Sequence, residues 1–103
     1  MTEPPMLVVG PDPVTLAEQV EAVVLAVPGV VRMDGGRFGG LGTYLPGRRV
    51  TGVRIDDEAG GTEVHIVVDA SRPVTATAGL VQRAVSAIAP MPVHVHVEDI
   101  DVV

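Results

Sequence analysis

The chain has 103 residues, a formal charge of −6 at neutral pH, no cysteine and two aromatic residues. A domain of this length buries about 60–70% of the surface of its unfolded chain, and the acidic balance disfavours nucleic-acid binding, which needs a basic face and stacking aromatic rings. The missing cysteine excludes disulfides and thiol chemistry, and no apolar run approaches the roughly 20 residues of a membrane span.

The start of the chain predicts a tail followed by one domain. Residues 1–5 contain Glu3-Pro4-Pro5 and offer nothing to pack, so they predict a flexible tail. Residues 6–103 then form a single domain, in which Met6–Val9 is a candidate first strand.

A helix is predicted to end at Pro28-Gly29. Two N-terminal signals precede it: Asp12 as an N-cap, and a capping box formed by Thr15 and Glu18. One apolar stripe with helical spacing follows, made of Leu16, Val20, Val23, Val24 and Val27.

Alternating valine-rich segments predict a sheet. These segments are Val30–Asp34, Val50–Asp56, Thr62–Asp69 and Val93–Val102. The polar, glycine-containing connector 57–61 predicts a hairpin between the second and the third of them. The alternation slips near Asp99-Ile100, which predicts a bulge in the last one.

A second helix is predicted from residues 70–73 to about Ala89. Its buried face is expected to consist of Val81, Ala84, Val85 and Ile88. The element order (β)-α-β-β-β-α-β predicts an α+β two-layer sandwich, with two helices packed on one face of a mixed sheet of four to five strands.

A glycine-rich stretch, Gly35–Arg49, interrupts this regular pattern. It holds half of the twelve glycines, the only Phe, the only Tyr and three of the arginines. It lacks the Lys-Ser/Thr pair of a phosphate-binding loop, and a strand follows it where a helix would be needed. Two interpretations stay open: a surface loop without a role, and a partner-docking loop. The candidate docking residues are Arg37, Phe38, Leu41, Tyr44, Leu45, Arg48 and Arg49.

A second candidate site lies on the last predicted strand. His94, His96 and Glu98 recur at every second residue and so share one face, and His65 lies on a neighbouring polar face. Two imidazoles and a carboxylate are legitimate zinc ligands. The same pattern is also typical of a solvated sheet face or of a pH-responsive patch.

No catalytic constellation is evident. Asp56, Asp57 and Glu58 lie in a predicted hairpin turn, where carboxylates are solvated. Ser71 and Ser86 are the only serines, and neither lies in a nucleophile elbow. We therefore expect a protein that is not an enzyme and needs no cofactor.

Several short strings resemble the alkaline shock protein family of bacterial envelope-stress proteins. They are Val27-Pro28-Gly29-Val30, Gly52-Val53 and Val95-His96-Val97-Glu98. The strings Gly35-Gly36-Arg37-Phe38-Gly39 and Tyr44-Leu45-Pro46-Gly47-Arg48-Arg49 are similar to the actinobacterial branch of that family. The resemblance covers residues 6–103, but this chain lacks the charged tails that many members carry.

The resemblance implies a non-enzymatic interaction domain that responds to envelope or alkaline stress. It further implies a cytoplasmic protein, peripheral at the inner face of the membrane, that binds a small membrane-anchored protein. The alternating valines add an expectation of a homo-oligomer that forms through a sheet edge. The alternative function is a small metal- or ligand-binding domain that uses the strand face of His94, His96 and Glu98.

Overall fold

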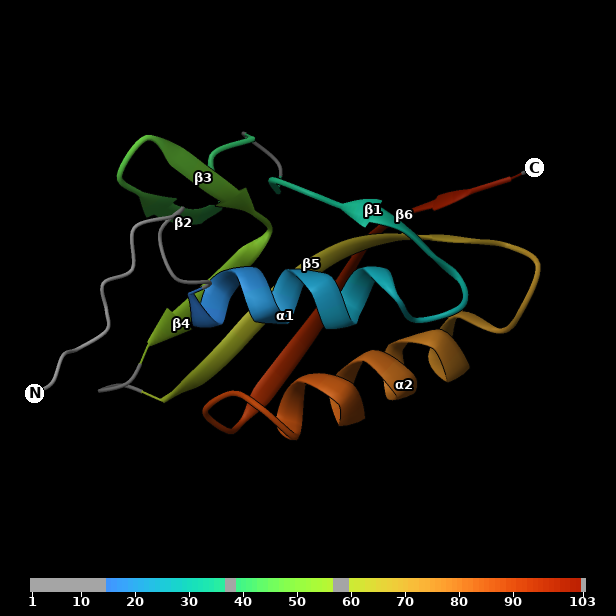
Figure 1. The fold of residues 1–103 in the computed structure, drawn as a ribbon. Helices are drawn as coiled ribbons and strands as arrows, with labels where there is room; N and C mark the ends of the chain where they lie inside the picture. The colour runs from blue at the N-terminus through green and yellow to red at the C-terminus, as the bar shows by residue number, and fades with distance from the viewer. Residues whose placement is uncertain (1–14, 37–38, 57–59, 103) are drawn as a thin grey trace, which may run out of the picture.

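Two helices cover one face of a four-stranded mixed sheet, and a separate two-stranded hairpin adjoins it (Figure 1). The computed structural model describes residues 15–36, 39–56 and 60–102. The elements in order are α1 (Leu16–Leu25), β1 (Val30–Met33), β2 (Gly42–Leu45), β3 (Arg48–Thr51), β4 (Val53–Asp56), β5 (Gly61–Asp69), α2 (Val74–Ser86) and β6 (Val93–Asp101). The predicted α+β sandwich is confirmed.

Helix α1 begins at the predicted capping box. The Thr15 hydroxyl accepts the backbone N–H of Glu18, and the Glu18 carboxylate accepts the backbone N–H of Thr15. Val20 and Val24 are fully buried against the sheet. The alternative cap at Asp12 and the candidate strand Met6–Val9 lie outside the described residues.

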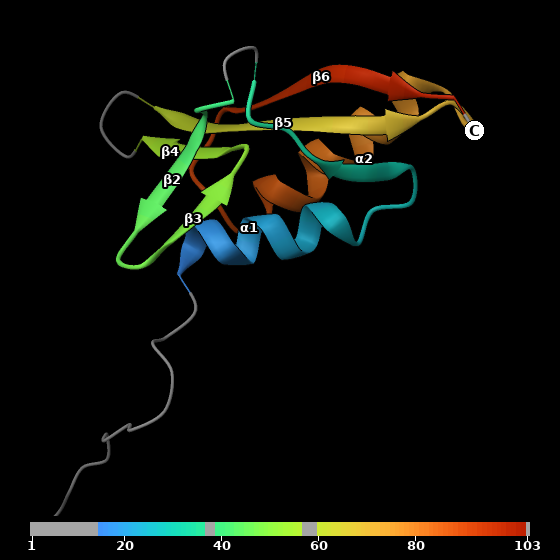
Figure 2. The same cartoon turned by 90° about the horizontal axis from the view of Figure 1, so that it is seen from above.

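Strand β5 is the centre of the sheet. Strand β6 runs parallel to it along one edge, while β1 and β4 pair antiparallel with different halves of the other edge (Figures 1 and 2). The predicted bulge in β6 is confirmed, because Val97 pairs with Ile66 and Asp99 pairs with Val67, so that Glu98 is the additional residue. The predicted association of two chains through a sheet edge stays a prediction.

The predicted strand Val50–Asp56 is wrong as one continuous element. Gly52, with φ of +78°, divides it into β3 and β4. β3 turns back through Pro46-Gly47 to pair with β2, whereas β4 pairs with β5. Part of the predicted glycine-rich loop is therefore a hairpin, which stands out from the sheet in Figure 2.

The core is built mainly from valine. On β5 the side chains of Val64, Ile66 and Val68 face the helices, and all three are fully buried. Helix α2 contributes Val81 and Val85 as predicted, together with Thr77. It ends at Ser86, earlier than predicted, so Ile88 lies beyond the helix and is 37% exposed.

Candidate functional site

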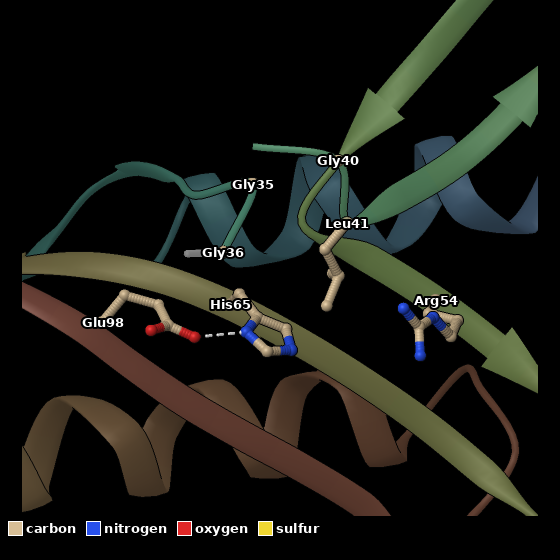
Figure 3. Close-up of a pocket in the computed structure, with 7 residues that line it drawn as sticks. All are labelled: Gly35, Gly36, Gly40, Leu41, Arg54, His65 and Glu98. Carbon is tan, nitrogen blue, oxygen red and sulfur yellow. Dashed lines mark hydrogen bonds and ion pairs between the residues drawn. The ribbon is translucent and has the colours of Figure 1, made fainter. Parts of the chain in front are cut away.

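Both ends of the glycine-rich segment are fixed to one residue of the central strand. The backbone N–H of Asp34 donates to the carbonyl of His65 at 2.8 Å, and the N–H of His65 donates to the carbonyl of Gly52 at 2.9 Å. Gly52 in turn donates to the carbonyl of Leu41 at 2.9 Å. These bonds hold residues 34–36 and 39–41 above the face of the sheet that the helices leave uncovered (Figures 2 and 3).

The loop, β4, β5 and β6 together enclose an open hollow of about 390 Å³. Figure 3 shows the His65 ring at its floor, with Leu41 reaching down from the loop beside it. None of the described lining residues offers a hydroxyl or a thiol as a nucleophile. The lining residues are Gly35, Gly36, Gly40, Leu41, Arg54, His65 and Glu98.

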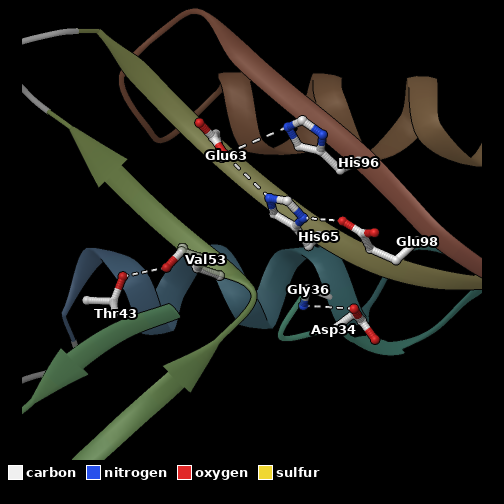
Figure 4. A network of polar contacts seen from close by, with 8 residues as sticks. All are labelled: Asp34, Gly36, Thr43, Val53, Glu63, His65, His96 and Glu98. Atoms are coloured by element: carbon white, nitrogen blue, oxygen red, sulfur yellow. Dashed lines mark hydrogen bonds and ion pairs between the residues drawn. The ribbon is translucent and has the colours of Figure 1, made fainter. Parts of the chain in front are cut away.

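Two of the lining residues, His65 and Glu98, belong to a group of four polar side chains that we call the histidine cluster: Glu63, His65, His96 and Glu98 (Figure 4). The parallel pairing of β5 with β6 places His65 directly beside His96. Their rings stack with centroids 4.2 Å apart and planes 10° from parallel. His65 is only 7% exposed, so its environment is fixed by the protein and not by solvent.

Carboxylates approach both nitrogens of His65. Nδ1 lies 2.5 Å from Oε2 of Glu98, and Nε2 lies 3.4 Å from Oε1 of Glu63. The same Glu63 oxygen lies 3.8 Å from Nε2 of His96. The ligand atoms of Glu63, His65 and His96 all lie within 4.8 Å of one another.

Among the described residues, the group of closely spaced ligand atoms differs from the predicted alternative set of His94, His96 and Glu98 and shares only His96 with it. His94 pairs with Glu63 in the register and is exposed, outside this group of three. Glu98 contacts the Nδ1 side of His65, away from the nitrogen that faces Glu63. Glu63 itself was missed, although it lies two residues before His65 on the predicted strand.

Comparison with known proteins identifies no relative of this chain. The chain matches no protein-family model, no curated protein and no solved structure.

The candidate docking residues separate into exposed and partly buried side chains. Tyr44 is 67% exposed, and the guanidinium of its cross-strand partner Arg49 lies 5.4 Å from the ring centroid. Leu41 and Leu45 are half-buried, and Leu45 packs against the core. Arg37 and Phe38 lie outside the described residues.

Arg48 binds helix α1 within its own chain. Its Nε and Nη2 donate to the two carboxylate oxygens of Glu18 at 2.6 and 3.1 Å, a forked ion pair. These hydrogen bonds, together with the one from the Thr15 backbone, lower the pKa of Glu18 from 4.5 to about 2. Arg48 thus forms a clamp between the hairpin and the start of α1, and its predicted role in partner binding stays a prediction.

Glu18→Gln is expected to weaken the dependence of the free energy of unfolding on pH between about pH 5 and pH 2. The folded-state pKa of about 2 lies below the ordinary 4.5, so the ionised form contributes stability above about pH 5 that is lost as the pH falls towards 2. Urea unfolding across this range should show a shallower loss for Glu18→Gln than for the wild type. Glu21→Gln removes a carboxylate of the same helix, keeps the pair, and should retain the wild-type slope. Equal slopes for Glu18→Gln and the wild type would contradict the clamp.

Proposed function

We propose that this chain is a non-enzymatic interaction domain that binds a protein partner through the β2–β3 hairpin. The resemblance of its loop strings to alkaline shock proteins supports this class of function. It also supports a site of action at the cytoplasmic face of the cell envelope, with a small membrane-anchored protein as the partner. None of the helices in the described ranges is long and apolar enough to cross a bilayer.

The observation that carries the proposal is the exposed Tyr44–Arg49 pair. Tyrosine and arginine are enriched at protein interfaces because they combine a large contact area with directional hydrogen bonds. Arg49 donates to the carbonyl of Gly39 at 2.5 Å, and the Tyr44 hydroxyl donates to that of Gly40 at 3.3 Å. The two side chains are therefore ordered before a partner binds, which lowers the entropic cost of binding.

The base of the hairpin is fixed as well. Val50 is 3% exposed within the core, and Thr43 donates to the carbonyl of Val53 at 2.5 Å. At the other end of the hairpin, beside its turn, Arg48 of β3 forms the ion pair with Glu18. The hairpin thus presents the pair on a rigid support, which suits a surface that recognises one partner.

Arg49→Ala is expected to sharply reduce partner capture through the Tyr44–Arg49 pair and to leave folding intact. Exposed substitutions of this kind change stability by only about 0.5 kcal/mol each. The measurement is site-specific photo-crosslinking in source cells, with benzoylphenylalanine at position 44 and, as the control, at Met91, which is 69% exposed. Position 44 should yield a product in the membrane fraction, and position 91 should not.

Arg48 is left unchanged in this experiment because its loss would remove the ion pair with Glu18 of α1. Arg49→Ala in the position-44 crosslinking chain should sharply reduce the membrane-fraction product while the melting temperature stays within a few degrees. Equal products from positions 44 and 91, or an undiminished product after Arg49→Ala, would overturn the proposed docking surface.

A further inference from the structure

We propose that Glu63, His65 and His96 bind a divalent transition-metal ion, with zinc as the expected ion. This site lies on the sheet face, apart from the exposed Tyr44–Arg49 pair, and does not depend on the proposed docking function. Two imidazoles and one carboxylate from protein, with water as the fourth ligand, form a common zinc coordination sphere.

The distances between ligand atoms fit such an ion. Zinc bonds of about 2.0–2.1 Å in a tetrahedron place neighbouring ligand atoms roughly 3.3 Å apart. The Glu63 oxygen lies 3.4 Å from Nε2 of His65 and 3.8 Å from Nε2 of His96. A charge-assisted hydrogen bond would be shorter, at about 2.7–2.9 Å. These two separations are close to the edge of a coordination tetrahedron and longer than an ideal charge-assisted hydrogen bond.

Glu98 prepares His65 for this role. An ionised carboxylate only accepts hydrogen bonds, so Nδ1 of His65 donates to Glu98 across the 2.5 Å contact. In the neutral ring, Nε2 then carries the lone pair and points it at Glu63. A metal ion bound between Nε2 of His65 and the Glu63 oxygen would replace this contact of two electron-rich atoms with two coordination bonds. Carboxylate–histidine–metal arrangements of this kind are widespread, and the outer carboxylate orients the ring and raises its basicity.

One movement is required. The lone pair of each imidazole lies in the plane of its ring, so two rings that stack 4.2 Å apart cannot both point at one ion. The His96 side chain is 46% exposed and the His65 side chain 9%, so His96 is the ring that can rotate out of the stack. Metal binding is therefore expected to break the stacking of the two rings.

The net charge of the side chains around the cluster favours binding of a cation. Glu63 and Glu98 supply two negative charges, and Arg54, which lines the hollow with His65 and Glu98, supplies one positive charge. The balance is negative before an ion binds. Arg54 also weakens the attraction, so Arg54→Ala is expected to bind the ion more tightly than the wild type.

The test is isothermal titration of the untagged, chelator-treated protein with zinc chloride, with magnesium chloride as the control ion. One zinc per chain is expected, with no magnesium binding, because magnesium prefers oxygen ligands. His96→Ala and Glu63→Gln should each weaken binding by at least about 10-fold, and Glu98→Ala by about 10–100-fold. His94→Ala removes an exposed histidine of the same strand and should bind like the wild type.

Two further measurements distinguish a loss of metal ligands from a loss of folding. Far-ultraviolet circular dichroism of each variant should match the wild type, and histidine ring signals in NMR spectra should shift for residues 65 and 96 but not for residue 94. Absence of zinc binding in folded wild-type protein would overturn the site. Loss of affinity in His94→Ala equal to that in His96→Ala would also overturn it, because it would indicate general surface binding.

Discussion

Gly52→Ala is expected to destabilise the domain by about 2–4 kcal/mol, whereas Gly47→Ala is expected to cost about 1 kcal/mol. The two glycines have almost the same backbone conformation, with φ of +78° and +76°. They differ in their surroundings. A Cβ at residue 52 would lie 2.8 Å from the carbonyl oxygens of both Asp34 and His65, while a Cβ at residue 47 would meet nothing within 4 Å.

Comparing these two glycine variants separates the cost of the left-handed backbone conformation from the cost of the steric collision. Gly47→Ala reports the left-handed conformation alone, and Gly52→Ala adds the collision with two backbone carbonyls that cannot move without breaking the sheet. Urea unfolding followed by circular dichroism gives both values. Equal losses at the two positions would show that the loop is not held against His65 as the structure has it.

Ile66→Ala is expected to cost about 2–5 kcal/mol, a large part of the 5–15 kcal/mol stability of an ordinary domain. Ile66 is fully buried and is among the largest of the completely buried side chains. The loss combines the missing transfer free energy with a cavity beneath two helices. For about 100 residues this amounts to a drop of roughly 10–30 °C in the melting temperature.

Ile100→Ala is the matched control on the neighbouring strand. Ile100 is 44% exposed, and the same atoms are deleted, so the expected loss is within about 0.5 kcal/mol. Differential scanning calorimetry of both variants checks the result. A melting temperature of Ile66→Ala close to that of Ile100→Ala would contradict the position of β5 at the centre of the core.

Much of the fold could be predicted from local pattern. The capping box at Thr15, the helical stripe through Val20 and Val24, and the alternating strands each depend on residues close in sequence. The division at Gly52 could not be predicted, because a glycine within an alternating segment is compatible with both a bulge and a strand end. Its positive φ is required because the chain changes its pairing partner at this residue: β3 before it pairs with β2, and β4 after it pairs with β5.

The candidate site depends on pairing that local pattern does not contain. The sequence placed His96 and Glu98 on one face of a strand, but the partners of that face come from β5, which is parallel to β6. Only this pairing brings His96 and Glu98 beside His65, whereas Glu63 lies two residues before His65 on the same strand. The role of Arg48 was missed for the same reason, since Glu18 is distant in sequence and its capping function gave no sign of a second partner.

The double attachment at His65 has a consequence for motion within the native state. The amides of Asp34 and His65 are protected by bonds that both involve the backbone of residue 65, and the amide of Gly52 is protected by the loop that these bonds hold. The glycine-rich segment therefore cannot detach as an independent flap. Opening it requires this part of the central strand to fray as well, so hydrogen exchange at the three amides should occur as one cooperative event with a shared free energy.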